Sequence, residues 1–344
     1  MLTEQKTKKI LEFLSQCQQK ADPLLIEELT ENVSKKFHPL VKHQIETGGK
    51  RIRPALTIAC CHLLGGKTSD VLAPACGLEI LHTYSLIIDD IIDNGLFRRN
   101  KPTVWAKYGK SIAQCIAIFY ASSIFQTTQK SPKPLEVSGL FSKTLKTLIE
   151  GEILDILFER EGRREEPYII EKRPKNISFK QYLEMITQKT GALLSACCEL
   201  GGIIANANPK EMEALKEYGI NLGIAFQMQD DILDMFGDEK SFGKKIGKDI
   251  EERKGGNLVL MMAFKKLSVK DKAKINSIMK QDKLIEADKK EIMGLIKKTN
   301  ALIKSMETAK SYAEQAKKAL KKLPQNHWNE LLADLVDFVV ERGK

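Results

Sequence analysis

LEILHTYSLIIDDIID (residues 78–93) and GIAFQMQDDILD (residues 223–234) are the two segments that indicate the fold class most directly. Both follow the helical periodicity that runs through nearly the whole chain, and neither alternates as a half-buried strand does. Each ends in two adjacent aspartates and a third aspartate three positions later. They predict buried helices with carboxylate clusters, which we call box 1 (Asp89, Asp90 and Asp93) and box 2 (Asp230, Asp231 and Asp234).

The rest of the composition also favours an all-α fold. The 344 residues are 42% apolar and 29% charged, which allows a large core under a well-solvated surface, while only 6% are aromatic. Leu, Ile, Ala, Lys and Glu dominate, and strand-like alternation is scarce. Helix breakers are local: a charged connection is expected at 161–176, a helix starting after Asn208, a loop at 237–256 and a buried helix at 258–264. We expect one all-helical domain over residues 1–344.

Charge and hydropathy exclude several classes of protein. The net charge of +10 reflects lysines concentrated between residues 265 and 322, without the interleaved arginines and aromatics of a nucleic-acid-binding surface. The N-terminal residues lack the apolar core and cleavage site of a secretory signal. No apolar run reaches the roughly 18–20 residues of a membrane span. We therefore expect a cytoplasmic protein without a transmembrane segment or a nucleic-acid partner.

The two boxes predict a divalent cation. On a helix, the first and third aspartates of a box lie on one face with the second beside them. Neighbouring carboxylates repel one another, and burying them without partners is costly. Mg²⁺ removes both problems, because it binds one or two carboxylates and completes its coordination with water and substrate phosphate oxygens. The alternative reading is a solvated charged face, which two boxes of identical spacing make less favourable.

Basic residues accompany both boxes. GGKRIRP at residues 48–54 supplies Lys50, Arg51 and Arg53. Arginine forks bind phosphate oxygens bidentately and lysine acts as a point charge, so Mg²⁺ with these cations could neutralise a diphosphate. Surface solubility remains the simpler reading for two of the lysines. The basic residues that follow the boxes are Arg98 and Arg99 after box 1, and Lys244, Lys245, Lys248 and Lys254 after box 2. For Lys245 and Lys248, a role in surface solubility is favoured over phosphate binding.

These motifs resemble those of the trans-prenyltransferases, the head-to-tail isoprenyl diphosphate synthases. GGKRIRP, DDIID followed by RRNKPT, GEILD, the KTG at 189–191, and FQMQDDILD followed by GKKIGKD appear in family order. The segment GKDIEERKGGN is similar in sequence to the corresponding segment of archaeal geranylgeranyl diphosphate synthases. Glu152 stands where glutamine is more usual, and Gly255-Gly256-Asn257 replaces the frequent Lys-x-Thr. The resemblance implies a single large helical bundle around a central cavity, and a homodimer.

The resemblance also implies a role for each matching position. Three Mg²⁺ ions per active site, two of them at box 1, would bridge both boxes to the allylic diphosphate. Thr190 and Gln227 would face the developing carbocation, beside the catalytic Lys189 and Lys244. The remaining implied ligands are Arg98, Lys189, Lys244 and Lys254 for the allylic diphosphate, and Lys50, Arg53, His82 and Arg99 for isopentenyl diphosphate.

The implied reaction is chain elongation by ionisation. The allylic C–O bond of dimethylallyl, geranyl or farnesyl diphosphate ionises, the alkene of isopentenyl diphosphate attacks, and a proton is lost. Leu81, Tyr84 and Ser85, which precede box 1, are expected to set the chain length, with Tyr84 resembling the pattern of C20-forming enzymes. Geranylgeranyl diphosphate is the expected product, and farnesyl or a longer polyprenyl diphosphate is the alternative. Tyr84 can equally be an ordinary core residue.

Three other readings stay open. A class I terpene cyclase shares the ionisation chemistry but usually carries an Asn/Ser/Glu-type second motif. A di-iron bundle needs two Glu-x-x-His motifs, and Glu79 with His82 forms only one. A non-catalytic partner subunit would be expected to have lost aspartates, whereas both boxes are complete.

Overall fold

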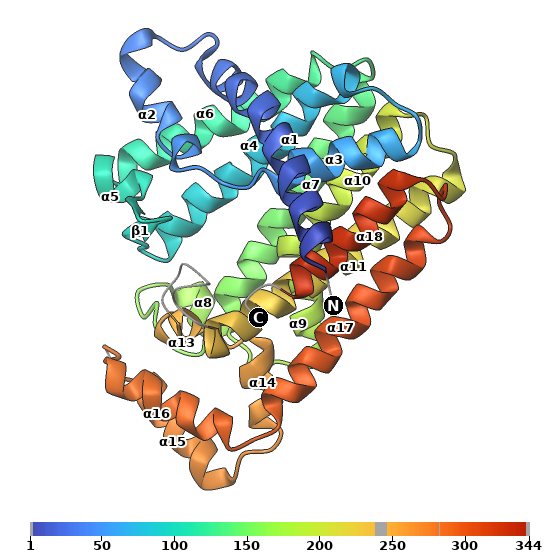
Figure 1. Ribbon diagram of the computed structural model, residues 1–344. Coiled ribbons are helices and arrows are strands. Elements are labelled where there is room, and N and C mark those ends of the chain that lie inside the picture. The colour runs from blue at the N-terminus through green and yellow to red at the C-terminus, as the bar shows by residue number, and fades with distance from the viewer. Residues whose placement is uncertain (1–2, 238–245, 282, 342–344) are drawn as a thin grey trace. The chain divides into compact units, whose positions relative to one another are not determined.

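The computed structural model describes residues 3–237, 246–281 and 283–341. Across these residues the chain is almost entirely helical, as Figure 1 shows. One short antiparallel hairpin pairs β1 (Phe97–Arg98) with β2 (Lys101–Pro102). The predicted all-α fold class is confirmed, and the hairpin is the feature that composition did not predict.

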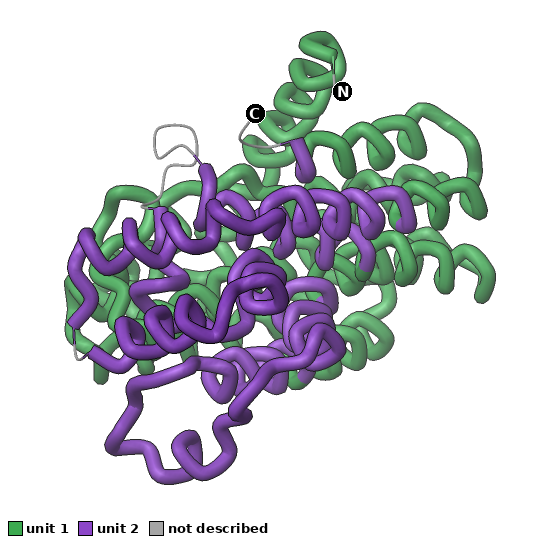
Figure 2. The backbone as a smooth tube through the Cα atoms, turned by 90° about the horizontal axis from the view of Figure 1, so that it is seen from below, with its two compact units in different colours: residues 1–146, 193–220, 316–338 green, residues 147–192, 221–315, 339–344 purple. Residues whose placement is uncertain are grey.

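Two compact units make up the chain, and Figure 2 colours them separately. Unit 1 comprises Met1–Lys146, Leu193–Ile220 and Ala316–Phe338, and unit 2 comprises Thr147–Ala192, Asn221–Gln315 and Val339–Lys344. Several helices contribute residues to both units. The expectation of one domain over residues 1–344 stays a prediction.

Unit 1 is built around α4 (Thr68–Ile92), the helix that leads into box 1. It packs chiefly against α3 (Ile52–Leu63) and α6 (Lys110–Thr128), because its apolar residues leave few positions for a solvated face. By length and composition α4 could cross a membrane, yet 61% of its most apolar window is buried inside the structure, as in a core helix. The other helices with residues in this unit are α1 (Glu4–Thr30), α2 (His38–Lys42), α5 (Val104–Tyr108), α7 (Pro134–Leu157), α10 (Ala192–Ile204), α11 (Pro209–Phe236), α17 (Ala301–Leu320) and α18 (His327–Val340).

Unit 2 contains the second half of α11, which carries box 2. A π-helical turn at Thr187–Gly191 follows α9 (Phe179–Ile186). The connection expected at 161–176 contains a short helix, α8 (Pro167–Lys172), in which proline stands in the first turn where its missing N–H costs nothing. Other helices that the described residues place wholly within this unit are α13 (Lys248–Glu251), α14 (Leu258–Phe264), α15 (Val269–Met279) and α16 (Glu286–Lys297).

Local capping explains where the helix that carries box 2 begins. Asn208 Oδ1 accepts hydrogen bonds from the backbone N–H groups of Lys210 and Glu211, each at 3.0 Å, and the Glu211 carboxylate accepts one from the Asn208 N–H at 2.8 Å. This reciprocal cap satisfies donors that the first helical turn leaves open. The predicted start of α11 after Asn208 and the predicted helix at 258–264 are both confirmed.

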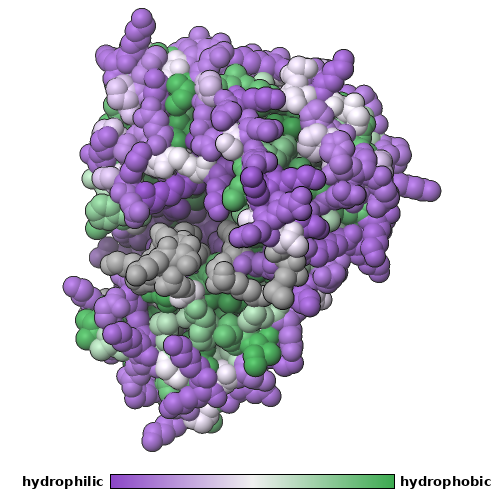
Figure 3. Space-filling view, viewed as in Figure 1, coloured by the Kyte–Doolittle hydropathy of each residue, from purple (hydrophilic) through white to green (hydrophobic). Residues whose placement is uncertain are grey.

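The surface agrees with the composition. The face seen in Figure 3 is predominantly hydrophilic, with hydrophobic residues confined to patches.

Candidate active site

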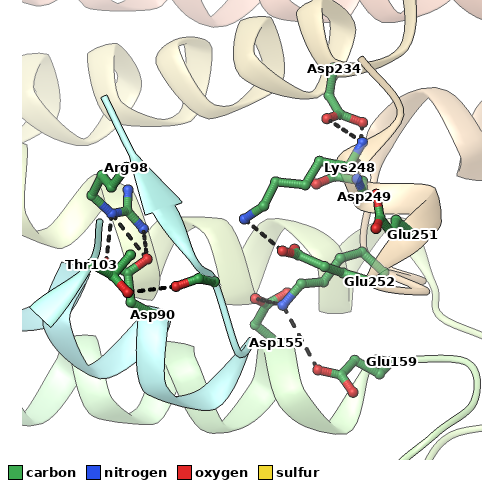
Figure 4. A network of polar contacts seen from close by, with 12 residues as sticks. Asp90, Arg98, Thr103, Asp155, Glu159, Asp234, Lys248, Asp249, Glu251 and Glu252 are labelled. Carbon is green, nitrogen blue, oxygen red and sulfur yellow. Dashed lines mark hydrogen bonds and ion pairs between the residues drawn. The ribbon is translucent and has the colours of Figure 1, made fainter. Parts of the chain in front are cut away.

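Box 1 lies at the C-terminal end of α4. Asp89 and Asp90 belong to its last turn, and Asp93 is the residue that ends the helix. Asp90 is only 4% exposed, and its two carboxylate oxygens accept hydrogen bonds from Arg98 Nε and Nη2 at 2.9 to 3.2 Å (Figure 4). Asp89 and Asp93 are half-buried. Asp90 therefore forms a hydrogen-bonded ion pair with Arg98, the arginine expected to bind the allylic diphosphate.

The hairpin that delivers Arg98 is fixed to the end of α4. The Gly95 N–H donates to the Asp90 carbonyl at 3.0 Å. The Gly95 carbonyl in turn accepts hydrogen bonds from Thr103 Oγ1 at 2.7 Å and Trp105 Nε1 at 2.8 Å. These bonds set the position of the β1–β2 hairpin relative to box 1, so the Arg98 fork reaches Asp90 without a flexible loop.

Unit 1 also gathers the cations predicted to bind isopentenyl diphosphate. Burial and the charges of Arg53, Arg99, Arg98 and Arg51 hold the pKa of His82 well below its ordinary value, so this imidazole is neutral. Burial, together with Arg51, Arg98 and Arg53, lowers the pKa of Arg99, although Glu79 opposes the shift. His82 and Arg99 thus experience the charges of the neighbouring arginines, whereas nearby acids raise the pKa values of Arg51 and Arg98. An anion placed among these basic groups would relieve their repulsion.

Box 2 is held by donors from several segments of unit 2. Asp231 Oδ2 accepts hydrogen bonds from the Tyr182 hydroxyl and the Leu258 N–H, both at 2.8 Å, and Asp231 Oδ1 accepts one from Gln227 Nε2 at 3.0 Å. Asp234 accepts from the backbone N–H groups of Lys248 at 3.0 Å and Asp249 at 3.1 Å (Figure 4). Asp231 and Asp234 thus position the chain that follows box 2.

The electrostatics of box 2 fit a cation. Burial and repulsion from Asp249 raise the pKa of Asp231 well above its ordinary value and that of Asp234 to about 9. Among the described residues, the hydrogen bonds to these two carboxylates do not offset burial and the charge of Asp249. Within the described residues, no three side chains of His, Cys, Asp or Glu form a ready-made metal cluster.

Lys189 and Thr190 lie in the π-helical turn of unit 2. Such turns occur frequently at functional sites. The Thr190 hydroxyl donates to Gln227 Oε1 at 2.8 Å, so the two oxygens predicted to face a carbocation lie together. A Cβ on Gly151 of α7 would lie 2.4 Å from the backbone nitrogen of Lys189, which is closer than real Cβ contacts come. Glycine therefore permits the contact between α7 and this turn.

Lys189 and Lys254 share one buried carboxylate. Asp155 Oδ2 lies 2.7 Å from Lys189 Nζ and 2.9 Å from Lys254 Nζ. Glu152, at the position where the family usually has glutamine, lies 2.6 Å from Lys189 Nζ, and Glu159 lies 3.9 Å from Lys254 Nζ. Figure 4 shows the side chains of Asp155 and Glu159 in this network. Lys189 and Lys254, both predicted diphosphate ligands, thus form ion pairs with acids that the sequence spacing did not identify as their partners.

The other predicted positions fall into separate parts of the structure. Lys244 lies outside the described residues. Leu81 is fully buried in the core of unit 1, while Tyr84 and Ser85 are half-buried. The Lys50 ammonium lies 5.4 Å from the centre of the Phe338 ring. Box 1 belongs to unit 1 and box 2 to unit 2, and their meeting at one cavity stays a prediction.

Sequence reasoning missed several residues of the site. Tyr182, Asn257 and Asp249 support box 2: Asn257 caps α14, and its Nδ2 donates to Asp249 Oδ2 at 2.7 Å. The cap explains why asparagine works at this position, where the family frequently has threonine. Arg51 was visible within GGKRIRP, but nothing in the sequence separated its role from that of Arg53.

Comparison with known proteins gives a consistent answer. Residues 34–296 match the family model described as "Polyprenyl synthetase". The short chain isoprenyl diphosphate synthase of Methanocaldococcus jannaschii is 36% identical over 276 residues, covering 79% of this chain and 80% of that protein. The geranylgeranyl diphosphate synthase of Saccharolobus solfataricus is 30% identical over 340 residues, covering 93% and 98%.

The fold agrees with the sequence matches. A polyprenyl synthase from Caulobacter crescentus CB15, solved with calcium and isoprenyl diphosphate, superimposes with a TM-score of 0.86 at 29% identity and covers 98% of each chain. Motif order, helical architecture and family match all concur. The chain therefore belongs to the polyprenyl synthetase family and is a trans-prenyltransferase.

Proposed function

We propose that this enzyme condenses isopentenyl diphosphate with allylic diphosphates and releases geranylgeranyl diphosphate. Two features of unit 1 carry the proposal. One is box 1, in which Arg98 fixes the central carboxylate, that of Asp90. The other is the set of basic side chains around His82 and Arg99. A diphosphate substrate would supply the anion for the basic residues, and a metal ion bound to it would supply the cation for the aspartates. The Saccharolobus relative and the aromatic Tyr84 five residues before box 1 support the C20 product.

Mg²⁺ is the proposed cofactor, with three ions per site and two at box 1. Asp89 and Asp93, four positions apart at the end of α4, would hold metal, and Asp230 would do so in box 2. Asp90, Asp231 and Asp234 already accept hydrogen bonds from protein donors and would orient the boxes. When bound, Mg²⁺ supplies charge neutralisation for the departing diphosphate.

The protein's own residues would carry the remaining work. Arg98, Lys189 and Lys254 hold the allylic diphosphate, so its negative charge develops among fixed cations as the C–O bond breaks. The oxygens of Thr190 and Gln227 stabilise the allylic cation. Its carbon is then attacked by the alkene electrons of isopentenyl diphosphate. The attack leaves a tertiary cation on the isopentenyl unit, and loss of a proton from the neighbouring carbon to the departed diphosphate restores a double bond.

Product analysis tests this proposal. Purified enzyme with Mg²⁺, labelled isopentenyl diphosphate and a C5, C10 or C15 primer should give a C20 product from each. Product from geranyl diphosphate alone would indicate a cyclase instead, and no diphosphate release with any primer would indicate a non-catalytic subunit. Tyr84→Ala should lengthen the product if Tyr84 forms the floor, and unchanged lengths would assign it to the core.

A homodimer is the proposed assembly. Helix α6 exposes four large apolar side chains at spacings of six and seven residues, which place them along one face. A second copy of the chain is the occupant that the family resemblance implies. Ile118→Glu should convert a dimer to a monomer in sedimentation experiments, whereas an unchanged mass would refute this interface. The four side chains are Ile112, Ile118, Phe119 and Phe125.

A further inference from the structure

Arg51 is one of the most completely engaged side chains of unit 1. It is only 4% exposed. Its Nε donates to Asp22 Oδ1 at 2.6 Å, its Nη1 to Glu79 Oε1 at 3.2 Å and the Gly48 carbonyl at 3.3 Å, and its Nη2 to the Ile45 carbonyl at 3.0 Å. One guanidinium thus joins α1, α4 and the backbone on both sides of residue 47. A fork that faces these acceptors is not aimed at a ligand.

The segment that Arg51 joins is the turn leading to Lys50. Arg51 itself adopts a left-handed backbone conformation with φ of 48°, which a non-glycine residue keeps only where its surroundings enforce it. Gly49 lies against two guanidinium groups, because a Cβ there would be 2.8 Å from Arg99 Nη1 and 3.1 Å from Arg51 Nη1. The turn, Arg51 and Arg99 therefore form one packed unit.

Charge explains why an acid pair is needed behind this turn. Arg99 and His82 both have pKa values lowered by burial and by neighbouring arginines, Arg51 included. Glu79 is 2% exposed and binds Arg51 directly, so it offsets part of the repulsion that would push Arg51 away from Arg99. Asp22 engages the third nitrogen of the guanidinium. Without these two acids, the guanidinium groups could not pack against the same glycine.

We propose that Arg51 is a positioning residue for the isopentenyl diphosphate site, with Asp22 and Glu79 as its anchors. Its hydrogen bonds fix the turn at 48–50, so that Lys50 and Arg99 present their charges to the diphosphate in a set geometry. This inference rests on the proposed function. It differs from that function in predicting selectivity: losing Arg51 should weaken one substrate and spare the other.

Steady-state kinetics with both substrates varied provide the test. Arg51→Met keeps an unbranched side chain similar to the aliphatic part of arginine and removes every hydrogen bond of the guanidinium. It should raise the KM for isopentenyl diphosphate about tenfold or more, because a displacement of about 1 Å can cost on the order of 100-fold. The KM for the allylic primer should stay within about twofold. Arg51→Lys retains the charge without the fork, so its KM should lie between those of the wild type and Arg51→Met.

Two further variants keep the result interpretable. Asp22→Asn removes a partly exposed anchor and should fold even if Arg51→Met does not, with a smaller rise in the same KM. Lys130→Met is the matched control, since Lys130 also bridges acids on α1 (Glu27, Glu28 and Glu31) but lies away from the turn. It should lower the melting temperature and leave both KM values unchanged.

Direct binding separates this inference from the proposed function. If the wild type condenses no substrates, the proposed function fails. Calorimetric measurement of the Kd for isopentenyl diphosphate still tests the positioning role of Arg51 in that case. A Kd weakened about tenfold in Arg51→Met supports the positioning role. Equal KM rises for both substrates, or a Kd for isopentenyl diphosphate that does not change, would overturn it.

Discussion

Asp155→Asn tests how much the buried carboxylate between two lysines contributes to the stability of unit 2. Asp155 is 7% exposed, and its Oδ2 lies within 2.9 Å of both Lys189 Nζ and Lys254 Nζ. Burial by itself would raise the pKa of Asp155, but the two ammonium groups outweigh it and hold the pKa below its ordinary value. Asparagine keeps the shape and removes the charge, so both lysines lose their shared counterion.

The magnitude follows from what the lysines retain. Breaking a buried ion pair costs about 3–5 kcal/mol, because one charge is left without compensation. Each lysine still has an acid nearby, because Glu152 lies 2.6 Å from Lys189 Nζ and Glu159 lies 3.9 Å from Lys254 Nζ. We therefore expect a loss of about 3 kcal/mol in the free energy of unfolding at pH 7, at the lower end of that range.

Urea unfolding followed by far-UV circular dichroism measures this loss. Because the folded-state pKa of Asp155 is depressed, its contribution is complete above the unfolded-state value near 4 and is lost as the pH falls through the folded-state value. The gap between wild type and variant should narrow below about pH 4. Glu166→Gln, which breaks an ion pair whose acid side chain is 51% exposed, should cost less than about 1 kcal/mol. An Asp155→Asn loss no larger than that of this control would refute the reasoning.

Other predictions concern the boxes and the cation cluster. Arg98→Lys cannot make the bidentate contact to Asp90, so kcat/KM should fall about 100-fold with an unchanged dichroism spectrum; a change below threefold would contradict it. His82 takes up a proton in the unfolded state near pH 6.5 but not in the folded state, so the wild type should lose stability as the pH falls from 6.5 to 5. His82→Gln should remove about 2 kcal/mol of this loss. Parallel curves of unfolding free energy against pH for wild type and variant would argue against this. Asp231→Ala strips hydrogen bonds from buried donors and should cost about 2–4 kcal/mol of stability, whereas the half-buried Asp230→Ala should mainly raise the Mg²⁺ concentration needed for activity; equal stability losses would refute the distinction.

Local signals in the sequence predicted much of the fold. The Asn208 cap and the apolar run at 258–264 predicted helix positions correctly, because a cap and a buried helical face are decided within a few residues. Helix α8 was missed, since six residues in a charged segment give too little periodicity to detect. The contacts around Asp155 could not be predicted either. They join residues 34 and 99 positions apart, and no local pattern records which lysine meets which acid.

The two boxes show most clearly where spacing stops being informative. Their aspartates recur at the same intervals, and a helix places them alike. Yet the donors that reach them differ: a guanidinium eight residues away holds Asp90, while a tyrosine 49 residues away and a backbone N–H 27 residues away hold Asp231.

Identical motifs can therefore divide their work differently, because a carboxylate whose oxygens already accept strong hydrogen bonds shapes the site more than it binds metal. The second aspartate of box 1, and the second and third aspartates of box 2, accept hydrogen bonds of this kind. The i, i+1, i+4 pattern thus predicts which residues can gather around a cation. We expect the donors that reach each aspartate from elsewhere in the fold to influence which of them bind it.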